Sequence, residues 1–411
     1  MPCAVWVASI VSSTSVPRPI LFAPRSSLLT PFDSLSRKSH RTLLASSAAS
    51  SGLDLVALSN ICVDIVLPVK DLPPLDVESR KKLLAEKSAS LAATGDRSNW
   101  EVGGSCNVAI AAARLGLRVA TCGNIASDVY GHFLRKTLEA EGIPQNAELA
   151  LADLFPTLRE TLLVLTFVTS GGKHAFCSRY DFGPWPLLKG IETLADGAHQ
   201  MMATAKAVFI NGFVFDELPP DVVALAAQRA QQAGAAIFFD PGPRAFTLQE
   251  GPRRAALDAI LDIADVVLMT QEEALAVAGE SEPFHAAKAV LDRPQARAQW
   301  VVIKLGGTGS QLHTSTHVVS QPAFQVEVKD CVGCGDSMGG AIVLGFIQKR
   351  SLSATLTLAN AVGGATAMGL GAGRNVAGRE DVLSLLQRGI DFPNPHGPSP
   401  ADCRAALELV A

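Results

Sequence analysis

Residues 330–337 read Asp-Cys-Val-Gly-Cys-Gly-Asp-Ser, between a strand-like segment at 324–328 and an apolar stretch that predicts a long helix. Gly333 and Gly335 keep the backbone beside Cys334 clear of side chains and allow positive φ. At the start of a helix, the N–H groups of such a turn can converge on an anion, and the helix dipole adds positive potential. We therefore predict that Gly333, Cys334 and Gly335 hold a phosphoryl group during its transfer.

Asp336 follows this turn, in the first turn of the predicted helix. A carboxylate there faces the same spot as the N–H groups and can accept the proton of an attacking hydroxyl. We assign Asp336 as the catalytic base. An ordinary capping aspartate at a glycine-rich helix start is the alternative interpretation of the motif taken alone.

The rest of the chain alternates short apolar runs with helical stretches. The predicted strands are 53–58, 118–122, 207–210, 236–239, 266–269 and 300–304, and the predicted helices are 107–115, 130–141, 219–232, 253–263, 272–278, 336–348 and 353–368. Fully apolar strands that alternate with helices indicate an α/β fold: a doubly wound, mostly parallel sheet with helices on both faces. Segments at about 65–102 and 158–182, the second a hairpin turning at 170–172, break this rhythm and predict a small β lid.

Composition excludes several classes of protein. Of 411 residues, 48% are hydrophobic and 18% charged, which indicates a large core. The net charge of −4 gives no reason to expect a nucleic-acid partner, and no apolar run is long enough to predict a membrane span. The eight cysteines are scattered, which argues against a disulfide framework. The pair Cys331 and Cys334 lacks a second pair for zinc, and a redox role stays open as a minor alternative.

The first fifty residues are rich in Ser and basic residues, and Asp33 is their only acid. This composition is typical of an organelle transit peptide, and the abundance of Ser favours the plastid, so we expect a chloroplast protein. A plain disordered tail is the alternative. The predicted organisation is therefore a disordered transit peptide at 1–50, a catalytic domain at 51–390 and a Pro-containing C-terminal tail at 391–411.

The chain lacks a G-x-x-x-x-G-K-[ST] loop and a well-placed G-x-G-x-x-G, which argues against P-loop kinases and nicotinamide-dependent oxidoreductases. Four segments instead resemble the ribokinase-like, or PfkB, family of carbohydrate and nucleoside kinases, in a plant plastid-type member. They are residues 60–64, residues 103–116 with 127–131, residues 265–279, and residues 330–336. The resemblance extends from about residue 53 to about residue 385 and implies the ribokinase-like fold.

The resemblance also implies a sugar site. It places Asp64 at the end of a strand beneath the lid, where a carboxylate accepts hydrogen bonds from sugar hydroxyls. Gly103 and Gly104 let the chain pass close to the sugar, and Asn107 bonds it at a helix start. For Asp64 the alternative is a surface turn, and for Asn107 a simple helix cap.

ATP and Mg²⁺ are the implied cofactors. Glu273 matches the acid that organises Mg²⁺ through water, although Thr270 stands where the family has Asn. Gly306 and Gly309 match the loop that approaches ATP, and Lys304 stands where a hydroxyl residue is common. Asn360 is assigned near the adenine, with a satisfied core amide as the alternative.

Several further features of the family match less closely. A monovalent cation such as K⁺ would lie at Asp330 and Val332, held mainly by carbonyl groups. Cys331 replaces a common Thr and Cys334 a common Ala, which leaves the backbone N–H groups in place. The turn at 240–244 should lie on the active-site edge of the sheet, where Arg244 contacts nucleotide phosphate or pairs with an acid.

The expected activity is transfer of the ATP γ-phosphoryl group to a primary hydroxyl of a nucleoside or ribose-type sugar. The long segment between Asp64 and Gly103 could help make room for a base. The alternatives are a kinase of another polyol or hexose, and a catalytically silent, kinase-like scaffold protein of plastids. A homodimer is one option for its assembly.

Overall fold

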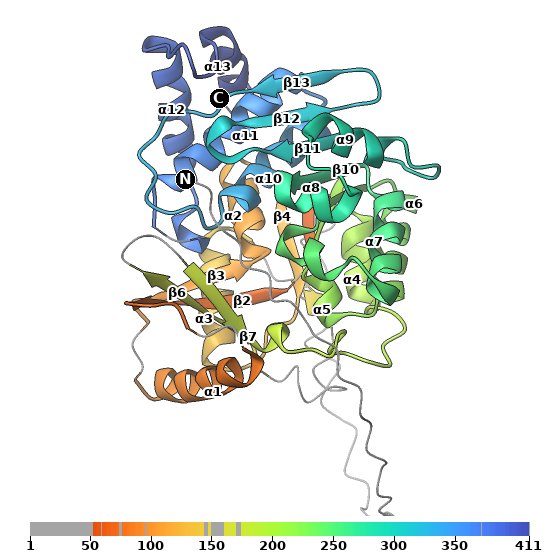
Figure 1. Cartoon of the computed structure of the whole chain (residues 1–411), viewed down its shortest axis with the longest axis vertical. Coiled ribbons are helices and arrows are strands. Elements are labelled where there is room, and N and C mark those ends of the chain that lie inside the picture. Colours follow the sequence, from red (N-terminus) through yellow and green to blue (C-terminus); the bar gives the residue numbers. More distant parts are fainter. Residues whose placement is uncertain are drawn as a thin grey trace, which may run out of the picture. The chain divides into compact units, whose positions relative to one another are not determined.

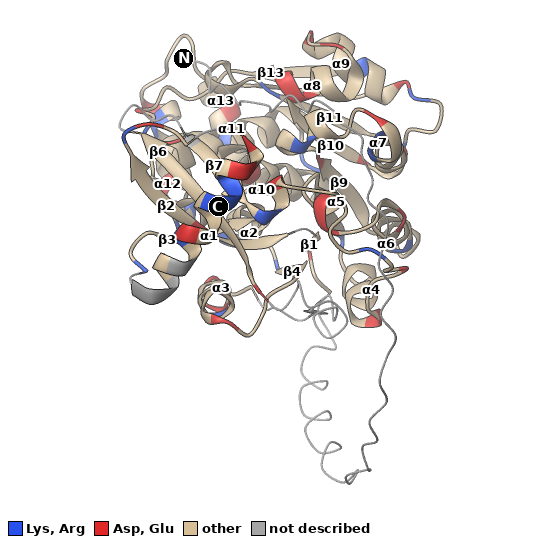
Figure 2. Ribbon diagram, turned by 60° about the horizontal axis from the view of Figure 1, so that its bottom comes forward, with Lys and Arg blue, Asp and Glu red and all other residues tan. Residues whose placement is uncertain are grey.

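The computed structural model describes residues 52–58, 60–73, 76–94, 97–143, 147–148, 160–169, 174–370 and 372–410. The expected transit peptide lies outside these residues, as does the turn expected at 170–172. Among the described helices, none is both long and apolar enough to cross a membrane. Lys and Arg are interspersed with Asp and Glu along the described ribbon (Figure 2), as the near-balanced charge of the sequence suggested.

Nine of the described strands form one large sheet (Figure 1). Their order is β13 (Val318–Gln321), β12 (Ser310–His313), β11 (Trp300–Lys304), β10 (Val266–Thr270), β9 (Ala236–Asp240), β8 (Ala207–Asn211), β1 (Leu55–Leu58), β4 (Val119–Gly123) and β5 (Ala147–Glu148). Neighbours from β11 to β5 are parallel. The last two strands, β12 and β13, are antiparallel additions at one edge.

Both faces of the large sheet are buried. In β1, Leu55 and Ala57 belong to one hydrophobic core, and Val56 and Leu58 to the other. The first core includes residues of α2 (Cys106–Arg114), α10 (Cys334–Ile347), α11 (Leu352–Ala367), α12 (Arg379–Asp391) and α13 (Pro400–Leu407). The second includes residues of α4 (Asp196–Ala203), α6 (Pro220–Gln232), α7 (Gly251–Ile263), α8 (Gln271–Ala278) and α9 (Pro283–Leu291). The predicted doubly wound, mostly parallel architecture is confirmed.

Four further described strands form a separate sheet, in the order β3 (Trp100–Gly104), β2 (Ile61–Val69), β6 (Leu162–Thr169) and β7 (His174–Ser178). We call it the lid sheet, because it occupies the segments predicted to form a lid. The expected position of Asp64 is wrong: it lies in the middle of β2, paired with Glu101 and Val164, and not at a strand end beneath the lid. The reason is that β1 ends at Leu58, before the chain enters the second sheet at Ile61.

Two expectations for the C-terminal half also need correction. The strand expected at 324–328 is irregular, and its apolar appearance reflects core packing, since Phe324 is buried. The expected tail at 391–411 contains α13, whose Cys403 and Ala406 are buried in the first core. Pro400 does not interrupt this helix, because it stands at the first helical position, where a missing N–H costs nothing.

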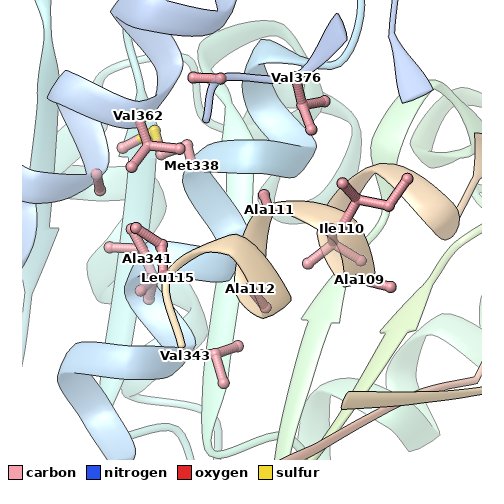
Figure 3. Close-up of a cluster of buried hydrophobic side chains, with 14 of the residues drawn as sticks. Ala109, Ile110, Ala111, Ala112, Leu115, Met338, Ala341, Val343, Val362 and Val376 are labelled. Atoms are coloured by element: carbon pink, nitrogen blue, oxygen red, sulfur yellow. The ribbon is translucent and has the colours of Figure 1, made fainter. Parts of the chain in front are cut away.

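Close packing of α2 against α10 brings the predicted site together. A Cβ added to Gly340 would lie 3.0 Å from the backbone N of Ala112, so glycine permits near contact of the two backbones. Small side chains such as Ala112 and Ala341 fill the space between the helices (Figure 3). Asn107 contacts Asp336 one turn earlier in both helices, so the helices run in the same direction and their N-termini converge.

Candidate active site

Three charged side chains meet where neighbouring strands of the large sheet end. Asp240 ends β9, Lys304 ends β11, and Glu273 lies in the first turn of α8, directly after β10. These strands are parallel neighbours, so their carboxyl ends share one edge of the sheet. Lys304 Nζ lies 2.7 Å from Asp240 Oδ2 and 4.0 Å from Glu273 Oε2. The lysine assigned to the cofactor is therefore held by two carboxylates.

Lys304 is a fixed positive charge. Burial by itself lowers the pKa of Lys304, but the carboxylates of Asp240 and Glu273 outweigh burial and raise the pKa above its ordinary value. The ammonium also lies beside the predicted anion turn, because a Cβ added to Gly335 would be 3.5 Å from Lys304 Nζ. A cation in this position can neutralise charge on a phosphoryl group held by the turn.

Asp336 lies in the first turn of α10, as predicted, and Asn107 fixes its orientation. Asn107 Nδ2 donates to Asp336 Oδ2 at 2.9 Å, and Asn107 Oδ1 accepts the N–H of Gly373 at 2.9 Å. Burial raises the pKa of Asp336, and Asp240 adds to this, while the Asn107 bond and the Lys304 charge oppose it. A raised pKa makes an ionised carboxylate a stronger proton acceptor.

The turn before Asp336 has the positive φ that its glycines were expected to supply. Gly333 adopts φ +80°, and a Cβ added to it would lie 3.0 Å from Ala372 Cβ. A larger residue there would be strained, so the glycine keeps the turn open. Cys331 is exposed and Cys334 is half-buried, and both are thiols in this structure. Binding of a phosphate group of ATP at this turn stays a prediction.

Asp330 shapes the same turn, because its Oδ1 accepts the N–H of Val332 at 3.1 Å. The side chain of Asp330 thereby supports the backbone at the two positions assigned to a monovalent cation. Binding of K⁺ at their carbonyl groups stays a prediction.

Asp64 lies against the backbone of the neighbouring strand. A Cβ added to Gly103 would be 2.3 Å from Asp64 Oδ2, so only glycine leaves room for the carboxylate. Cys62 Sγ donates to Asp64 Oδ1 at 3.3 Å, and Gly104 adopts φ +62° as β3 ends. Burial raises the pKa of Asp64 to about 7, the Cys62 bond opposes this, and the charge of Asp336 adds to it. The predicted sugar-binding acid and the predicted base therefore share one site.

Glu273 and Thr270 form a reciprocal cap at the start of α8. Thr270 Oγ1 accepts the N–H of Glu273 at 3.1 Å, and Glu273 Oε2 accepts the N–H of Thr270 at 2.7 Å. Thr270 thus caps the helix, a task that Asn also performs well. The departure from the family pattern leaves Glu273 in place.

The acids of the site fit Mg²⁺ held through water better than a direct metal cage. Among the described residues, no group of three or more His, Cys, Asp or Glu side chains is placed to hold a metal. Mg²⁺ usually keeps several waters and binds one or two carboxylates plus phosphate oxygens. Glu273 is buried at the sheet edge and suits this role.

The loop after β11 requires its glycines. Gly306 adopts φ +58° and Gly309 φ +111°, and a Cβ added to Gly309 would lie 2.1 Å from the carbonyl oxygen of Gln321. This loop directly follows Lys304, and its role as the loop that approaches ATP stays a prediction.

Asn360 has the geometry of the alternative given for it. Its Nδ2 donates to the carbonyls of Gln321 and Pro322 at 3.0 and 3.1 Å, and its Oδ1 accepts from Ser310 Oγ at 2.7 Å. Both ends of the amide hold the edge of the large sheet together. The side chain is therefore committed within the protein and not presented to an adenine.

Asp240 was not among the predicted site residues, although the turn at 240–244 was expected at the active-site edge of the sheet. A charged residue at the end of an apolar strand was the available signal. For Arg244 the acid-pairing alternative is observed: its guanidinium lies 2.5 Å from Asp216 Oδ2 and 3.1 Å from Asp181 Oδ1. Arg244 therefore links the segments that contain Asp181 and Asp216, and Lys304 remains the candidate cation for phosphate.

A partly buried carboxylate, a glycine turn at a helix start and a fixed ammonium thus lie together at one edge of a doubly wound sheet, and phosphoryl transfer uses groups of these kinds. Residues 82–377 match the pfkB family of carbohydrate kinases. Because the match covers most of the sequence, the chain belongs to this family. As a member, it is a phosphotransferase that acts on a hydroxyl acceptor.

Individual relatives are more distant. The protein named probable fructokinase-4 of Arabidopsis thaliana is 28% identical over 302 residues, which cover 69% of this chain and 87% of the relative. The ATP-dependent ribose-1-phosphate kinase of Halopiger xanaduensis is 26% identical over 334 residues, which cover 80% of this chain and 96% of the relative. The structure of Arabidopsis thaliana ribokinase complexed with ribose and ATP superposes with a TM-score of 0.59 at 19% identity, covering 82% and 99%. This structural likeness confirms the ribokinase-like fold.

Proposed function

We propose that the chain is an ATP-dependent kinase that phosphorylates a primary hydroxyl of a ribose-type sugar or a nucleoside. The observation that carries this proposal is the partly buried Asp336 carboxylate beside the Gly333–Gly335 turn, within the field of the Lys304 ammonium. The family match supports phosphorylation of a carbohydrate in general. The choice of acceptor rests on the sequence features described above.

The residues of the chain divide the work of the reaction. The oxygen of the acceptor hydroxyl bonds to the γ-phosphorus while the bond from this phosphorus to the leaving ADP oxygen breaks. Asp336 accepts the proton of the hydroxyl during this step. The N–H groups of the Gly333–Gly335 turn and the Lys304 ammonium stabilise the negative charge on the phosphoryl oxygens. Bound Mg²⁺ would supply further positive charge at the triphosphate, with Glu273 holding it through water.

Binding of the acceptor falls to Asp64 and its neighbours. An ionised carboxylate can accept two O–H donors, and Gly103 keeps the backbone beside Asp64 free of side chains. Asn107 links this region to the base, because its amide holds Asp336. This arrangement suits a sugar that presents adjacent hydroxyls to Asp64 and a primary hydroxyl to Asp336.

The test measures ADP formation by the full-length chain with ATP, Mg²⁺ and an acceptor panel of ribose, fructose, inositol, adenosine and uridine. On the best acceptor, Asp336→Asn should reduce turnover by roughly 10²–10⁴-fold, the usual contribution of a general base, with little change in acceptor affinity. Asp221→Asn is the matched control, since this exposed aspartate lies in the first turn of α6. Near-normal turnover of Asp336→Asn would refute the assignment of the base, and no turnover with any acceptor would favour the silent scaffold.

We also propose that residues 1–50 direct the protein to plastids. The support is compositional: abundant Ser, several Arg residues, and Asp33 as the single acid. A fluorescent fusion of residues 1–60 should accumulate in plastids, and the same fusion with its Arg residues replaced by Glu should not. Uniform cytosolic fluorescence of the unaltered fusion would contradict the proposal.

A further inference from the structure

Two cysteines border the glycine turn that precedes Asp336. Cys331 is exposed, and Cys334 is half-buried at the first position of α10. The other described cysteines are all buried: Cys62, Cys106, Cys122, Cys177 and Cys403. A thiol reacts with a reagent in solution only where the reagent can reach it. Among the described cysteines, Cys331 and Cys334 are therefore the two that such a reagent contacts first.

The buried thiols are held within the protein. Cys177 Sγ donates to the carbonyl of Arg80 in α1 (Val77–Thr94) at 3.5 Å, and Cys62 Sγ donates to Asp64 Oδ1 at 3.3 Å. Burial also raises the pKa of each of the five buried thiols. They therefore stay protonated near neutral pH, and the protonated thiol is a poor nucleophile.

Residues 331–334 form a hydrogen-bonded reverse turn with the two cysteines at its ends. The N–H of Cys334 donates to the carbonyl of Cys331 at 3.3 Å. Gly333 adopts φ +80° and ψ −5°, the values of the third position of a type II turn. The end residues of such a turn have Cα atoms less than about 7 Å apart, and a disulfide requires about 4.4–6.8 Å. The turn thus holds Cys331 and Cys334 at a separation that one disulfide can span.

The thiol of Cys334 points back across this turn. Cys334 Sγ lies 3.9 Å from the carbonyl oxygen of Asp330, and this carbonyl is bonded directly to the backbone N of Cys331. The sulfur therefore lies on the side of the turn where Cys331 begins. The exposed side chain of Cys331 has room to rotate toward it.

We propose that Cys331 and Cys334 are a dithiol site that exchanges with disulfides, and that the bond formed between them switches off phosphoryl transfer. The Cys331 thiolate attacks one sulfur of an incoming disulfide, whose S–S bond breaks and releases one thiol. The Cys334 thiolate then attacks the Cys331 sulfur of the mixed disulfide and releases the second thiol. Two cysteine thiols are oxidised, and the incoming disulfide is reduced to two thiols that take up the two protons. An excess of a dithiol reverses both steps.

The new bond would change the turn that contains the proposed anion ligands. Its two sulfurs would be about 2.05 Å apart, so Cys334 Sγ would leave the carbonyl of Asp330 and draw the ends of the turn together. Gly333 lies inside the ring that closes, and a glycine lets the backbone rotate. N–H groups that no longer face the phosphoryl group cannot stabilise its charge, and loss of one such donor costs about 10²–10³ in turnover. This effect on turnover rests on the proposed kinase function, whereas formation of the disulfide does not.

The experiment treats the full-length chain with an excess of oxidised glutathione, alkylates the remaining thiols and identifies disulfide-linked residues by mass spectrometry. Cys331 and Cys334 should be linked. ADP formation with ATP, Mg²⁺ and the best acceptor should fall by about 10- to 10³-fold and return after treatment with dithiothreitol. Cys331→Ser should keep basal turnover and resist oxidised glutathione. The matched control is Cys3→Ser, which removes a cysteine outside the described residues and should respond as the unaltered chain does.

Three results would overturn the proposal. They are the absence of a bond between Cys331 and Cys334, a bond that leaves turnover unchanged, and an equal loss of turnover in Cys331→Ser. Failure of the proposed kinase function is distinguishable from these results, because the reduced chain would then have no turnover with any acceptor. Mass spectrometry would still decide whether the dithiol site exists.

Discussion

Replacement of Asp64 by Asn should stabilise the protein at alkaline pH while it weakens acceptor binding. Burial raises the pKa of Asp64 from its ordinary value of 3.8 to about 7. The folded chain therefore binds this proton more tightly than the unfolded chain, and the associated stability is present below about pH 4 and lost as pH rises through 7. At about 1.4 kcal/mol per pH unit, the full difference is about 4 kcal/mol. Water in the site reduces this difference, so we expect Asp64→Asn to be more stable than the unaltered chain by about 2–4 kcal/mol at alkaline pH.

The assay is urea unfolding of both proteins at pH 4.5 and pH 8.5, followed by fluorescence. Asn keeps an oxygen for the Cys62 thiol but cannot ionise, so the gain in stability of Asp64→Asn should be largest at pH 8.5 and should fall to about 1 kcal/mol at pH 4.5. Acceptor affinity of the unaltered chain should rise with pH through about 7, as the ionised carboxylate becomes available. The variant should lose this dependence.

The matched control is Asp71→Asn, an exposed aspartate shortly after β2, which should show no such pH-dependent difference. Asp64→Asn that is less stable at pH 8.5 would refute the reasoning, because Asp64 would then be better satisfied as a charged group than its surroundings imply. An unchanged acceptor affinity in this variant would refute its role in sugar binding.

Two further substitutions test the rest of the site. Lys304→Met leaves Asp240 and Glu273 without their shared cation, so the free energy of unfolding should fall by about 3–5 kcal/mol and ATP affinity should drop. The control is Lys288→Met, which removes an exposed ion pair and should cost under about 1 kcal/mol. Equal losses of stability in the two variants would contradict the pairing of Lys304 with these acids. Gly309→Ala places a Cβ 2.1 Å from a carbonyl oxygen, so it should lower the free energy of unfolding by about 2 kcal/mol more than Gly234→Ala does. Gly234 is the matched control because it has a similar φ of +101° but open space around it. Equal stability of the two variants in urea unfolding would show that the loop after β11 rearranges at little cost.

Much of the fold was predictable because buried parallel strands are nearly continuous apolar runs, as β8 and β10 are up to their last residues, Asn211 and Thr270. The edge strands β12 and β13 escaped prediction because they are short and their polar residues hide the pattern. Helix α1 escaped for a related reason, since its apolar residues are few and scattered among charged ones. Helix α13 was missed because the preceding Pro-rich segment suggested a surface loop.

The catalytic turn was predictable because its requirements are local. Gly333, Gly335 and Asp336 lie within four residues, and backbone N–H groups are the proposed anion ligands, so the neighbouring sequence contains the whole motif. The same holds for Gly103 and Gly104. By contrast, the hydrogen-bond and ion-pair partners of a long polar side chain come from segments distant in the sequence, so no local pattern predicts them.

The sequence by itself determined the α/β class, the glycine turn with its carboxylate, and the family to which both point, because these depend on the order of residues along one segment at a time. Tertiary structure alone decided the partners. It paired Lys304 with Asp240, 64 residues away, committed Asn360 to the sheet edge, and joined Asn107 to Asp336 across 229 residues. It also set Asp64 between Glu101 and Val164 in the lid sheet, because strand register, and not sequence spacing, sets which residues of different strands are paired.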